Sequence, residues 1–244
     1  MTADTNPPPG TLYLIPVPLG GIDPSWVVPE PVRQLACRLD TFVVEHPKTA
    51  RHILKLYGIT RPLQEITLLT LNEHTPATEL DALLQPMLAS RDVGLMSEAG
   101  CPGVADPGAD LVRLAHNRNI RVVPLVGPSS ILLALMASGL NGQGFVFHGY
   151  LPAEKEQRIK KLGEIERDSR NRGQTQIFIE TPYRNRQMLA DILDSCQKVT
   201  LLTVAVDITL PTEYIHTRTI ADWQKTAAPE LHKRPAIFLL HSPS

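Results

Sequence analysis

Short apolar runs alternate with amphipathic stretches from Thr11 onward, and this alternation limits the fold more than any other feature of the sequence. The runs of the first half have the length of β-strands: Leu12–Val17, Thr41–Glu45, Glu65–Thr70, Val93–Ser97 and Arg121–Leu125. Between them, the apolar residues of 80–88 and 111–115 recur at helical spacing. Strands that alternate with helices are typical of a parallel sheet with crossover helices, so we expect an α/β fold.

The second half predicts a second α/β domain with a mixed sheet. Its runs are rich in the β-branched and aromatic residues that strands favour: Phe145–Tyr150, Gln174–Ile179, Val199–Val206, Glu213–Thr219 and Pro235–His241. Between Val206 and Glu213 there is no room for a helix, which predicts an antiparallel pair. The segment 129–140 is apolar nearly all round and predicts a helix buried between two layers.

These patterns divide the chain into three parts. Residues 1–10 contain three successive prolines after Asn6 and predict a flexible tail. An N-terminal, mostly parallel α/β domain is expected over 11–126, and a C-terminal α/β domain over 127–244.

Composition narrows the possible partners. The formal net charge is −1, from 24 basic and 25 acidic residues, so no overall positive field attracts nucleic acid. No apolar run approaches the ~18 residues that cross a bilayer, and the first ten residues lack the pattern of a signal peptide, so we expect a cytoplasmic protein without a membrane partner. The cysteines Cys37, Cys101 and Cys196 are odd in number and widely spaced, which predicts reduced thiols and no metal site.

Several common site motifs are absent from the sequence. There is no G-x-G-x-x-G after a strand, no G-x-x-x-x-G-K and no G-x-S-x-G, so nicotinamide, P-loop and serine-hydrolase sites have no support. His46 and His52 are six positions apart and would lie on different faces of a helix, which does not suit a metal ion.

The loops that follow the predicted strands carry the remaining signals. Ligands of open parallel sheets bind at the carboxyl ends of the strands, where loops lead into helix N-termini. Here these loops are rich in glycine and proline: Val17–Gly21, Ser97–Gly108, Gly127–Ser130 and Glu180–Arg184. Asp106, followed by Pro107, is expected to cap the next helix. Together the loops predict a cradle for a polar ligand.

At these loops the sequence resembles the tetrapyrrole methylase superfamily, and most of all its branch of small-subunit ribosomal RNA ribose-O-methyltransferases. The residues that carry the resemblance, in the family's order, are Pro18 and Gly20, Glu45, Ser97–Gly108, Gly127–Ser129, Gly149–Pro152 and Glu180–Arg184. The resemblance implies two α/β domains with S-adenosylmethionine in the cleft between them, in a homodimer.

The resemblance also implies the site residues. Carried over by position, the cofactor contacts are Leu19, Gly20, Gly100, Cys101, Pro102, Val104, Ser129, Ser130, Ile131, Thr181, Pro235 and Ala236. Methyl transfer from a sulfonium needs positioning rather than a nucleophilic side chain. A ribose hydroxyl would still benefit from a general base, for which Glu45 and Glu180 are the candidates, although either could instead accept backbone hydrogen bonds. The expected contacts to the acceptor are His46, Lys48, Arg51 and Arg184.

Departures from the RNA branch fall on the acceptor side. Val206 stands where that branch has an arginine, and Leu210 where it has a lysine. The stretch 154–172 has seven basic residues against five acids, which favours a solvated helix of mixed charge over an RNA contact. We therefore expect an S-adenosylmethionine-dependent methyltransferase acting on RNA. Methylation of a tetrapyrrole or another small molecule, and a cofactor-binding protein without catalysis, are the alternatives.

Overall fold

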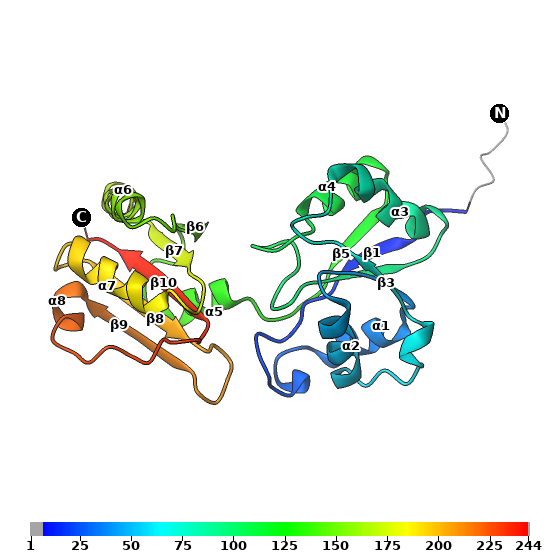
Figure 1. The fold of residues 1–244 in the computed structure, drawn as a ribbon, viewed down its shortest axis with the longest axis horizontal. Coiled ribbons are helices and arrows are strands. Elements are labelled where there is room, and N and C mark those ends of the chain that lie inside the picture. Colours follow the sequence, from blue (N-terminus) through cyan, green and yellow to red (C-terminus); the bar gives the residue numbers. More distant parts are fainter. Residues whose placement is uncertain (1–6, 244) are drawn as a thin grey trace. The chain divides into compact units, whose positions relative to one another are not determined.

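The computed structural model describes residues 7–243 and separates into two compact units, with the division after Pro128 (Figure 1). We call the part up to Pro128 the N-terminal unit and the part from Ser129 the C-terminal unit. Each has its own sheet and its own hydrophobic core.

The N-terminal unit is built on a parallel sheet with the strand order β3-β2-β4-β1-β5. Its strands are β1 (Thr11–Leu14), β2 (Thr41–Val44), β3 (Thr67–Thr70), β4 (Val93–Met96) and β5 (Arg121–Pro124). Its α-helices are α1 (Glu30–Arg38), α2 (Pro47–Leu56), α3 (Leu80–Leu88) and α4 (Ala109–Asn117), with short 3₁₀ turns η1 (Pro24–Trp26), η2 (Leu63–Glu65) and η3 (Ala77–Glu79). The expected parallel α/β arrangement is confirmed.

Helices cover both faces of this sheet, as the strand sequences require. Phe42 and Val44 of β2 pack with α1 and α2, whereas Val43 points to the other face and packs with α3 and α4 (Figure 1). All residues of β2 and β4 are buried, because these strands have a neighbour on each side and helices above and below.

The C-terminal unit holds a mixed sheet with the order β6-β7-β10-β8-β9, in which only β6 and β7 run parallel. Its strands are β6 (Phe145–Tyr150), β7 (Thr175–Ile179), β8 (Leu201–Val206), β9 (Tyr214–Thr219) and β10 (Ala236–His241). Its helices are α5 (Ser130–Ser138), α6 (Lys155–Arg172), α7 (Asn185–Ser195) and α8 (Ile220–Trp223). The predicted antiparallel pair β8–β9 is confirmed.

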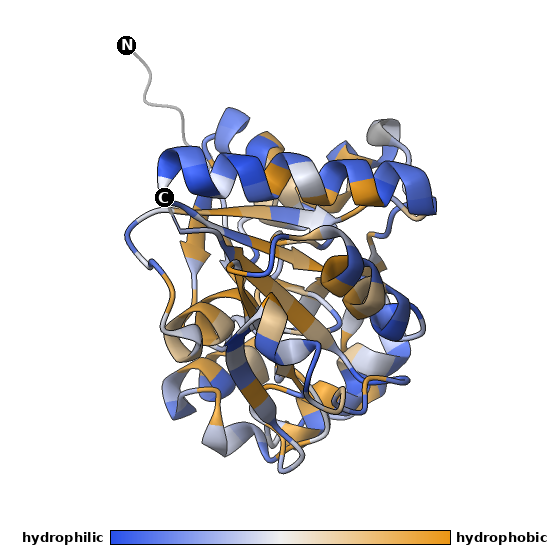
Figure 2. Ribbon diagram, turned by 90° about the vertical axis from the view of Figure 1, so that its left-hand side faces the viewer, coloured by the Kyte–Doolittle hydropathy of each residue, from blue (hydrophilic) through white to orange (hydrophobic). Residues whose placement is uncertain are grey.

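The core of this unit lies between the sheet and the helices α6, α7 and α8. Leu162 and Ile165 of α6, Met188 of α7 and Trp223 of α8 pack against strand residues such as Phe238. The outer face of α6 is hydrophilic, as Figure 2 shows for the long helix. The narrow apolar stripe that contains Leu162 and Ile165 is thus enough to anchor α6.

The helix α5 differs from its prediction. It packs on β9 and β10, and the Thr217 hydroxyl donates a hydrogen bond to the Ser138 carbonyl at 2.7 Å. Only Ala134, Leu135 and Ser138 are buried, whereas Leu132 is 51% and Met136 78% exposed. The expectation of a helix buried between two layers is wrong, because within its unit α5 meets the sheet along one face only.

The beginning of the chain also differs in part. Residues 1–6 of the expected flexible tail lie outside the described residues. At the end of the predicted tail, the Gly10 amide donates a hydrogen bond to the Met87 carbonyl at 2.8 Å, and the Ser90 hydroxyl donates one to the Pro8 carbonyl at 2.8 Å. Residues 8–10 therefore belong to the fold, because the turn after α3 offers partners for their backbone.

Candidate functional site

The loops after β1, β4 and β5 meet in the N-terminal unit because these three strands are neighbours in the sheet. Val17 and Gly100 exchange two backbone hydrogen bonds, of 2.9 and 3.1 Å, and so join the first two loops. The Cys101 thiol donates to the Pro128 carbonyl at 3.4 Å and joins the second loop to the third. The structure thus brings together the loops that carry Leu19, Gly100 and Cys101.

Two glycines keep this region free of side chains. Gly100 has a φ of +73°, and a Cβ added to it would lie 3.2 Å from Leu19 Cδ2 and 3.5 Å from the Pro128 carbonyl oxygen. A Cβ at Gly127 would lie 2.2 Å from the Pro16 ring. The loops therefore expose backbone at close quarters, which suits a ligand held by amides and carbonyls.

The other expected cofactor residues of this unit line the same loops with different exposure. Gly20 and Val104 are exposed, the latter by 47%, and Pro102 is buried. Val104 and Pro102 belong to the turn that leads from β4 to α4.

Asp106 does not cap the following helix, contrary to the prediction. The N-cap of α4 is Gly108, with a φ of +128° and no side-chain hydrogen bond. Gly103 and Ala105 also have positive φ angles, so the loop turns sharply and ends two residues after Asp106. The carboxyl group of Asp106 instead lines a pocket of about 670 Å³, together with Asn72 and Thr75.

Carboxylates that follow neighbouring strands influence one another here. Burial raises the pKa of Asp106 to about 6, and the negative charges of Glu45 and Glu98 add to the shift, while a hydrogen bond from Ser97 opposes it. Burial and Glu98 also raise the pKa of Glu45. Sequence reasoning chose Glu45 and missed Asp106, because the Asp-Pro pair resembles a helix start.

The cations expected beside Glu45 lie at the start of α2. His46 Nδ1 is 3.5 Å from Glu98 Oε1, and the Thr49 hydroxyl donates to Glu98 at 3.1 Å. Lys48 and Arg51 are exposed on the first turns of the helix. Glu98 is therefore bound to the beginning of α2, and Lys48 and Arg51 face solvent.

Glu180, the second candidate base, is tied to Arg184 in the C-terminal unit. Its Oε1 accepts hydrogen bonds from the Thr181 amide at 2.6 Å and from Arg184 Nη2 at 2.7 Å. The carboxylate is 1% exposed, and its Oε2 has no hydrogen-bond partner among the described residues. Oε1 of Glu180 is therefore occupied by Arg184 and Thr181, whereas Oε2 can accept a hydrogen bond from a donor outside the chain.

The remaining expected cofactor residues of this unit lie at two places. Ser129 caps α5, where its hydroxyl accepts from the Leu132 amide at 3.5 Å, and Ser130 and Ile131 form the first turn. Ala236 begins β10 directly after Pro235, and Ile237 of this strand pairs with Ile179 at the end of β7. Ala236 therefore lies beside the Glu180–Thr181 turn at one edge of the sheet.

Val206 and Leu210 surround a second fixed carboxylate. Val206 is fully buried in the core, and Asp207 follows it with a φ of +49°. Asp207 accepts hydrogen bonds from Arg234 Nε at 2.8 Å and from the Thr212 hydroxyl at 2.7 Å. This segment is thus built around packing and an internal ion pair.

Two features are absent from residues 7–243. No group of His, Cys, Asp and Glu in this range could hold a metal ion. In the same range, no helix has the length and apolar character to cross a membrane.

Comparisons with known proteins give consistent results. No family model matches the sequence. The chain is 31% identical over 233 residues to the ribosomal RNA small subunit methyltransferase I of Xylella fastidiosa, which covers 95% of this chain and 81% of that protein. It is 32% identical over 196 residues to the protein of the same name from Vibrio cholerae, covering 80% of this chain and 64% of that one.

Solved structures share the fold at lower identity. The methyltransferase CobJ superposes with a TM-score of 0.63 at 19% identity, over 96% of this chain and 94% of its own. A uroporphyrin-III C-methyltransferase from Thermus thermophilus, complexed with S-adenosyl homocysteine, superposes with a TM-score of 0.57 at 14% identity, over 95% and 97% of the two chains. These are tetrapyrrole methylases, so the fold expected from the sequence is confirmed.

Proposed function

Because this chain belongs to the family of ribosomal RNA small subunit methyltransferases I, we propose that it transfers the methyl group of S-adenosylmethionine to a ribose hydroxyl of small-subunit ribosomal RNA. The observation that carries this proposal is the 31% identity to a family member over 95% of the chain. The match includes the loops of both units to which the cofactor contacts were assigned.

The residues present fit the cofactor in two respects. Gly100 keeps the space beside Leu19 and the Pro128 carbonyl free of a side chain. Glu180 Oε2 is a buried acceptor without a partner among the described residues, and the cofactor has an ammonium and an adenine amine to donate. In this proposal Leu19, Gly100 and Cys101 of the N-terminal unit would hold it.

When bound, the cofactor supplies a methyl group on a positively charged sulfur, so the leaving group is already activated. The chain must then orient the ribose hydroxyl and accept its proton. We assign the proton to Asp106, whose pKa of about 6 makes it largely ionised and still basic near neutral pH. The negative charge of Glu45 adds to the effect of burial in raising the pKa of Asp106. Glu180 is a poorer base because Arg184 and Thr181 already occupy its Oε1.

Lys48 and Arg51 are the proposed contacts to the acceptor RNA in the N-terminal unit. They are exposed, and they begin the helix that follows Glu45. His46 lies toward Glu98, and Arg184 is bound to Glu180, so these two are less free to contact a phosphate than the sequence indicates.

The proposal is tested in two steps. Calorimetric titration with S-adenosylmethionine and S-adenosylhomocysteine should give micromolar binding, or about −8 kcal/mol. Labelled methyl from the cofactor should then enter ribosomal RNA of small subunits from cells that lack this protein. Label in a small molecule instead would establish the tetrapyrrole alternative, and binding without transfer would establish a protein without catalysis.

The resemblance also implies a homodimer, and the hydropathy pattern of the sequence predicts a place in the cytoplasm; we propose both. Sedimentation equilibrium of the full chain measures the first. Fractionation of cells with an antibody against the chain measures the second.

A further inference from the structure

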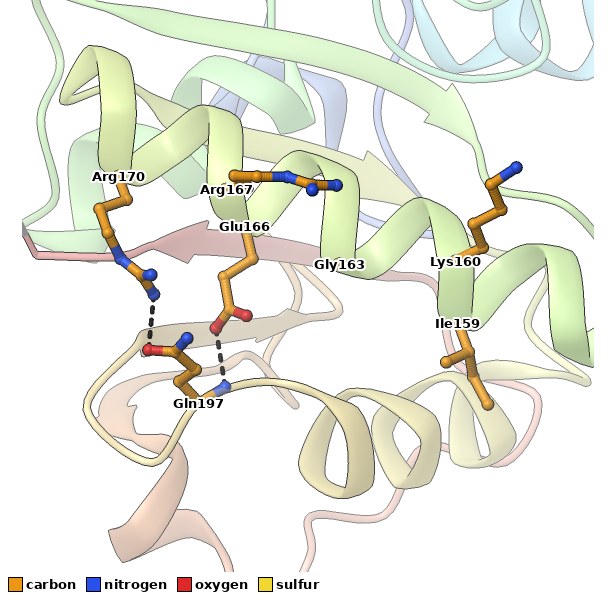
Figure 3. Close-up of a pocket in the computed structure, with 7 residues that line it drawn as sticks. All are labelled: Ile159, Lys160, Gly163, Glu166, Arg167, Arg170 and Gln197. Atoms are coloured by element: carbon orange, nitrogen blue, oxygen red, sulfur yellow. Dashed lines mark hydrogen bonds between the residues drawn. The ribbon is translucent and has the colours of Figure 1, made fainter.

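A groove runs along α6 in the C-terminal unit, between this helix and the segment that carries Gln197. It has a volume of about 350 Å³, and Figure 3 shows the residues that line it: Ile159, Lys160, Gly163, Glu166, Arg167, Arg170 and Gln197. All but Gln197 come from α6. The spacing of Lys160, Gly163, Arg167 and Arg170 places them along one face of the helix. The groove therefore has a row of cations along one wall.

The cations of α6 differ in whether they already have partners. Arg158 is buried and forms an ion pair with Asp191 at 2.6 Å, and Lys161 pairs with Glu164 at 3.6 Å. Lys160 and Arg167, in contrast, have no acidic partner within the described part of the chain, and both are exposed. Lys160 and Arg167 are thus the cations of the groove without an acidic partner in the described chain, whereas Lys155 and Arg172 of the same helix lie outside it.

The acidic member of the groove is already satisfied. Glu166 is buried, and its Oε1 accepts hydrogen bonds from the Gln197 amide at 2.8 Å and from the Thr200 hydroxyl. Arg170 Nη2 donates to Gln197 Oε1 at 2.6 Å, as Figure 3 shows. This contact occupies the acceptor of the Gln197 side chain and leaves its amino group to donate. The groove therefore presents mainly donors and positive charge.

Gly163 has no structural reason to be a glycine. It lies in the middle of an α-helix, where glycine is unfavourable, and a Cβ added to it would meet nothing within 4 Å. Its effect is to leave the middle of the groove open between Lys160 and Arg167. An open floor with cations on both sides suits an extended, negatively charged chain.

We propose that the α6 groove binds the phosphate backbone of the RNA acceptor, outside the residues that hold the cofactor. This inference rests on the proposed function for the identity of the polyanion. Lys160 and Arg167 are seven residues apart, about 10 Å along the helix axis, and so contact different phosphates of one strand. Such contacts position RNA without reading its sequence.

The test compares two double variants of the full chain with equal loss of charge on the same helix. Lys160→Gln with Arg167→Gln removes the free cations of the groove. Lys155→Gln with Arg172→Gln removes two cations of α6 that do not line it. Affinity for small-subunit ribosomal RNA, prepared free of protein, is measured against salt concentration by filter binding. Cofactor affinity of each variant, measured by calorimetry, checks that the fold is intact.

We expect the groove variant to bind RNA about tenfold more weakly near 0.15 M salt, with a salt slope lower by about 1.4, because each lost contact to single-stranded RNA removes about 0.7. The matched variant should change both quantities much less. Equal losses in the two variants would mean that general charge, not the groove, attracts RNA, and would overturn the proposal.

A filled groove provides an independent test that leaves the charge unchanged. Gly163→Leu places a side chain on the open floor, and Asn171→Leu adds the same side chain to an exposed position of α6 outside the groove. Only the first should weaken RNA binding, by severalfold. Loss of binding to whole small subunits with unchanged binding to naked RNA would assign the groove to a ribosomal protein instead.

Failure of this inference can be told from failure of the proposed function. If the groove variants bind RNA normally and methyl transfer to RNA persists, the groove is wrong and the enzyme assignment stands. If the unchanged protein neither binds RNA nor transfers methyl to it, both fail.

Discussion

In the N-terminal unit, the carboxylates of Glu45 and Asp106 have no arginine or lysine partner among the described residues, and burial together with neighbouring negative charges raises their pKa values. In the C-terminal unit, Glu180 and Asp207 also follow strands, but each accepts a hydrogen bond from an arginine, at 2.7 and 2.8 Å. All four carboxylates lie in segments that follow strands, where ligands of α/β folds bind. A position after a strand therefore does not distinguish a general base from a carboxylate that is held in an ion pair, whereas the presence of an arginine partner does.

The largest effect should come from Asp106→Asn. If this carboxylate accepts the ribose proton, kcat should fall at least about 100-fold, within the range that general bases contribute. Cofactor affinity should change little, and single-turnover methyl transfer measures the step itself. The matched variant Asp110→Asn, in the same pocket, should keep most of the activity. A fall of less than threefold in Asp106→Asn would remove it from the proton transfer.

The pH dependence should show the same carboxylate. A base with a pKa of about 6 is protonated below that value, so kcat should drop about tenfold per pH unit below 6 and level off above it. Glu45→Gln removes a neighbouring negative charge and should shift this midpoint to lower pH. A midpoint that Glu45→Gln leaves in place would break the link between the two groups.

Removal of the arginine that pairs with Glu180 should lower the free energy of unfolding. Arg184→Met leaves the buried Glu180 carboxylate without its cation, and the free energy of unfolding should fall by about 1–3 kcal/mol, as measured by urea denaturation. Arg186→Met, at the start of α7, breaks an exposed ion pair with Glu230 of the loop before β10 and should cost under about 1 kcal/mol. Equal losses would mean that Glu180 is held by its other contacts.

The smallest effect should be a gain in thermal stability on replacement of Asp106. The pKa of Asp106 is raised on folding, so the protonated carboxyl stabilises the folded state below pH 3.8, and this contribution is lost as the pH rises through about 6. Asp106→Asn stays neutral and should raise the Tm slightly at pH 7 but not near pH 4. A lower Tm at pH 7 would show that the carboxylate has a structural role after all.

The sequence predicts the sheets of both units well, because strand periodicity and apolar runs depend on local residues. The runs ending at Thr70 and Ile179, for example, end where β3 and β7 end. Burial of α5 is predicted wrongly, since an apolar helix carries no record of how many of its faces meet other elements.

The candidate site is predicted less evenly. Leu19, Gly100 and Cys101 could be placed together, because the order of strands in such a fold brings their loops to one edge. The ion pair between Glu180 and Arg184 is not predicted by the sequence. The sequence suggests a general base at Glu180 and an acceptor contact at Arg184, and the ion pair in part excludes both roles. The pocket beside Asp106 depends on the positive φ angles of Gly103 and Ala105, and only the first of these has a residue type that indicates one.

The division into two cores also decides what intrinsic fluorescence can report. The chain has two tryptophans, one in each unit. Trp26 is 79% exposed and already in contact with water, so its emission changes little on unfolding, whereas Trp223 is 1% exposed and donates a hydrogen bond to the Leu202 carbonyl at 2.8 Å. A red shift of the emission spectrum therefore follows the melting of the C-terminal core, and the N-terminal unit can unfold almost unseen by this probe.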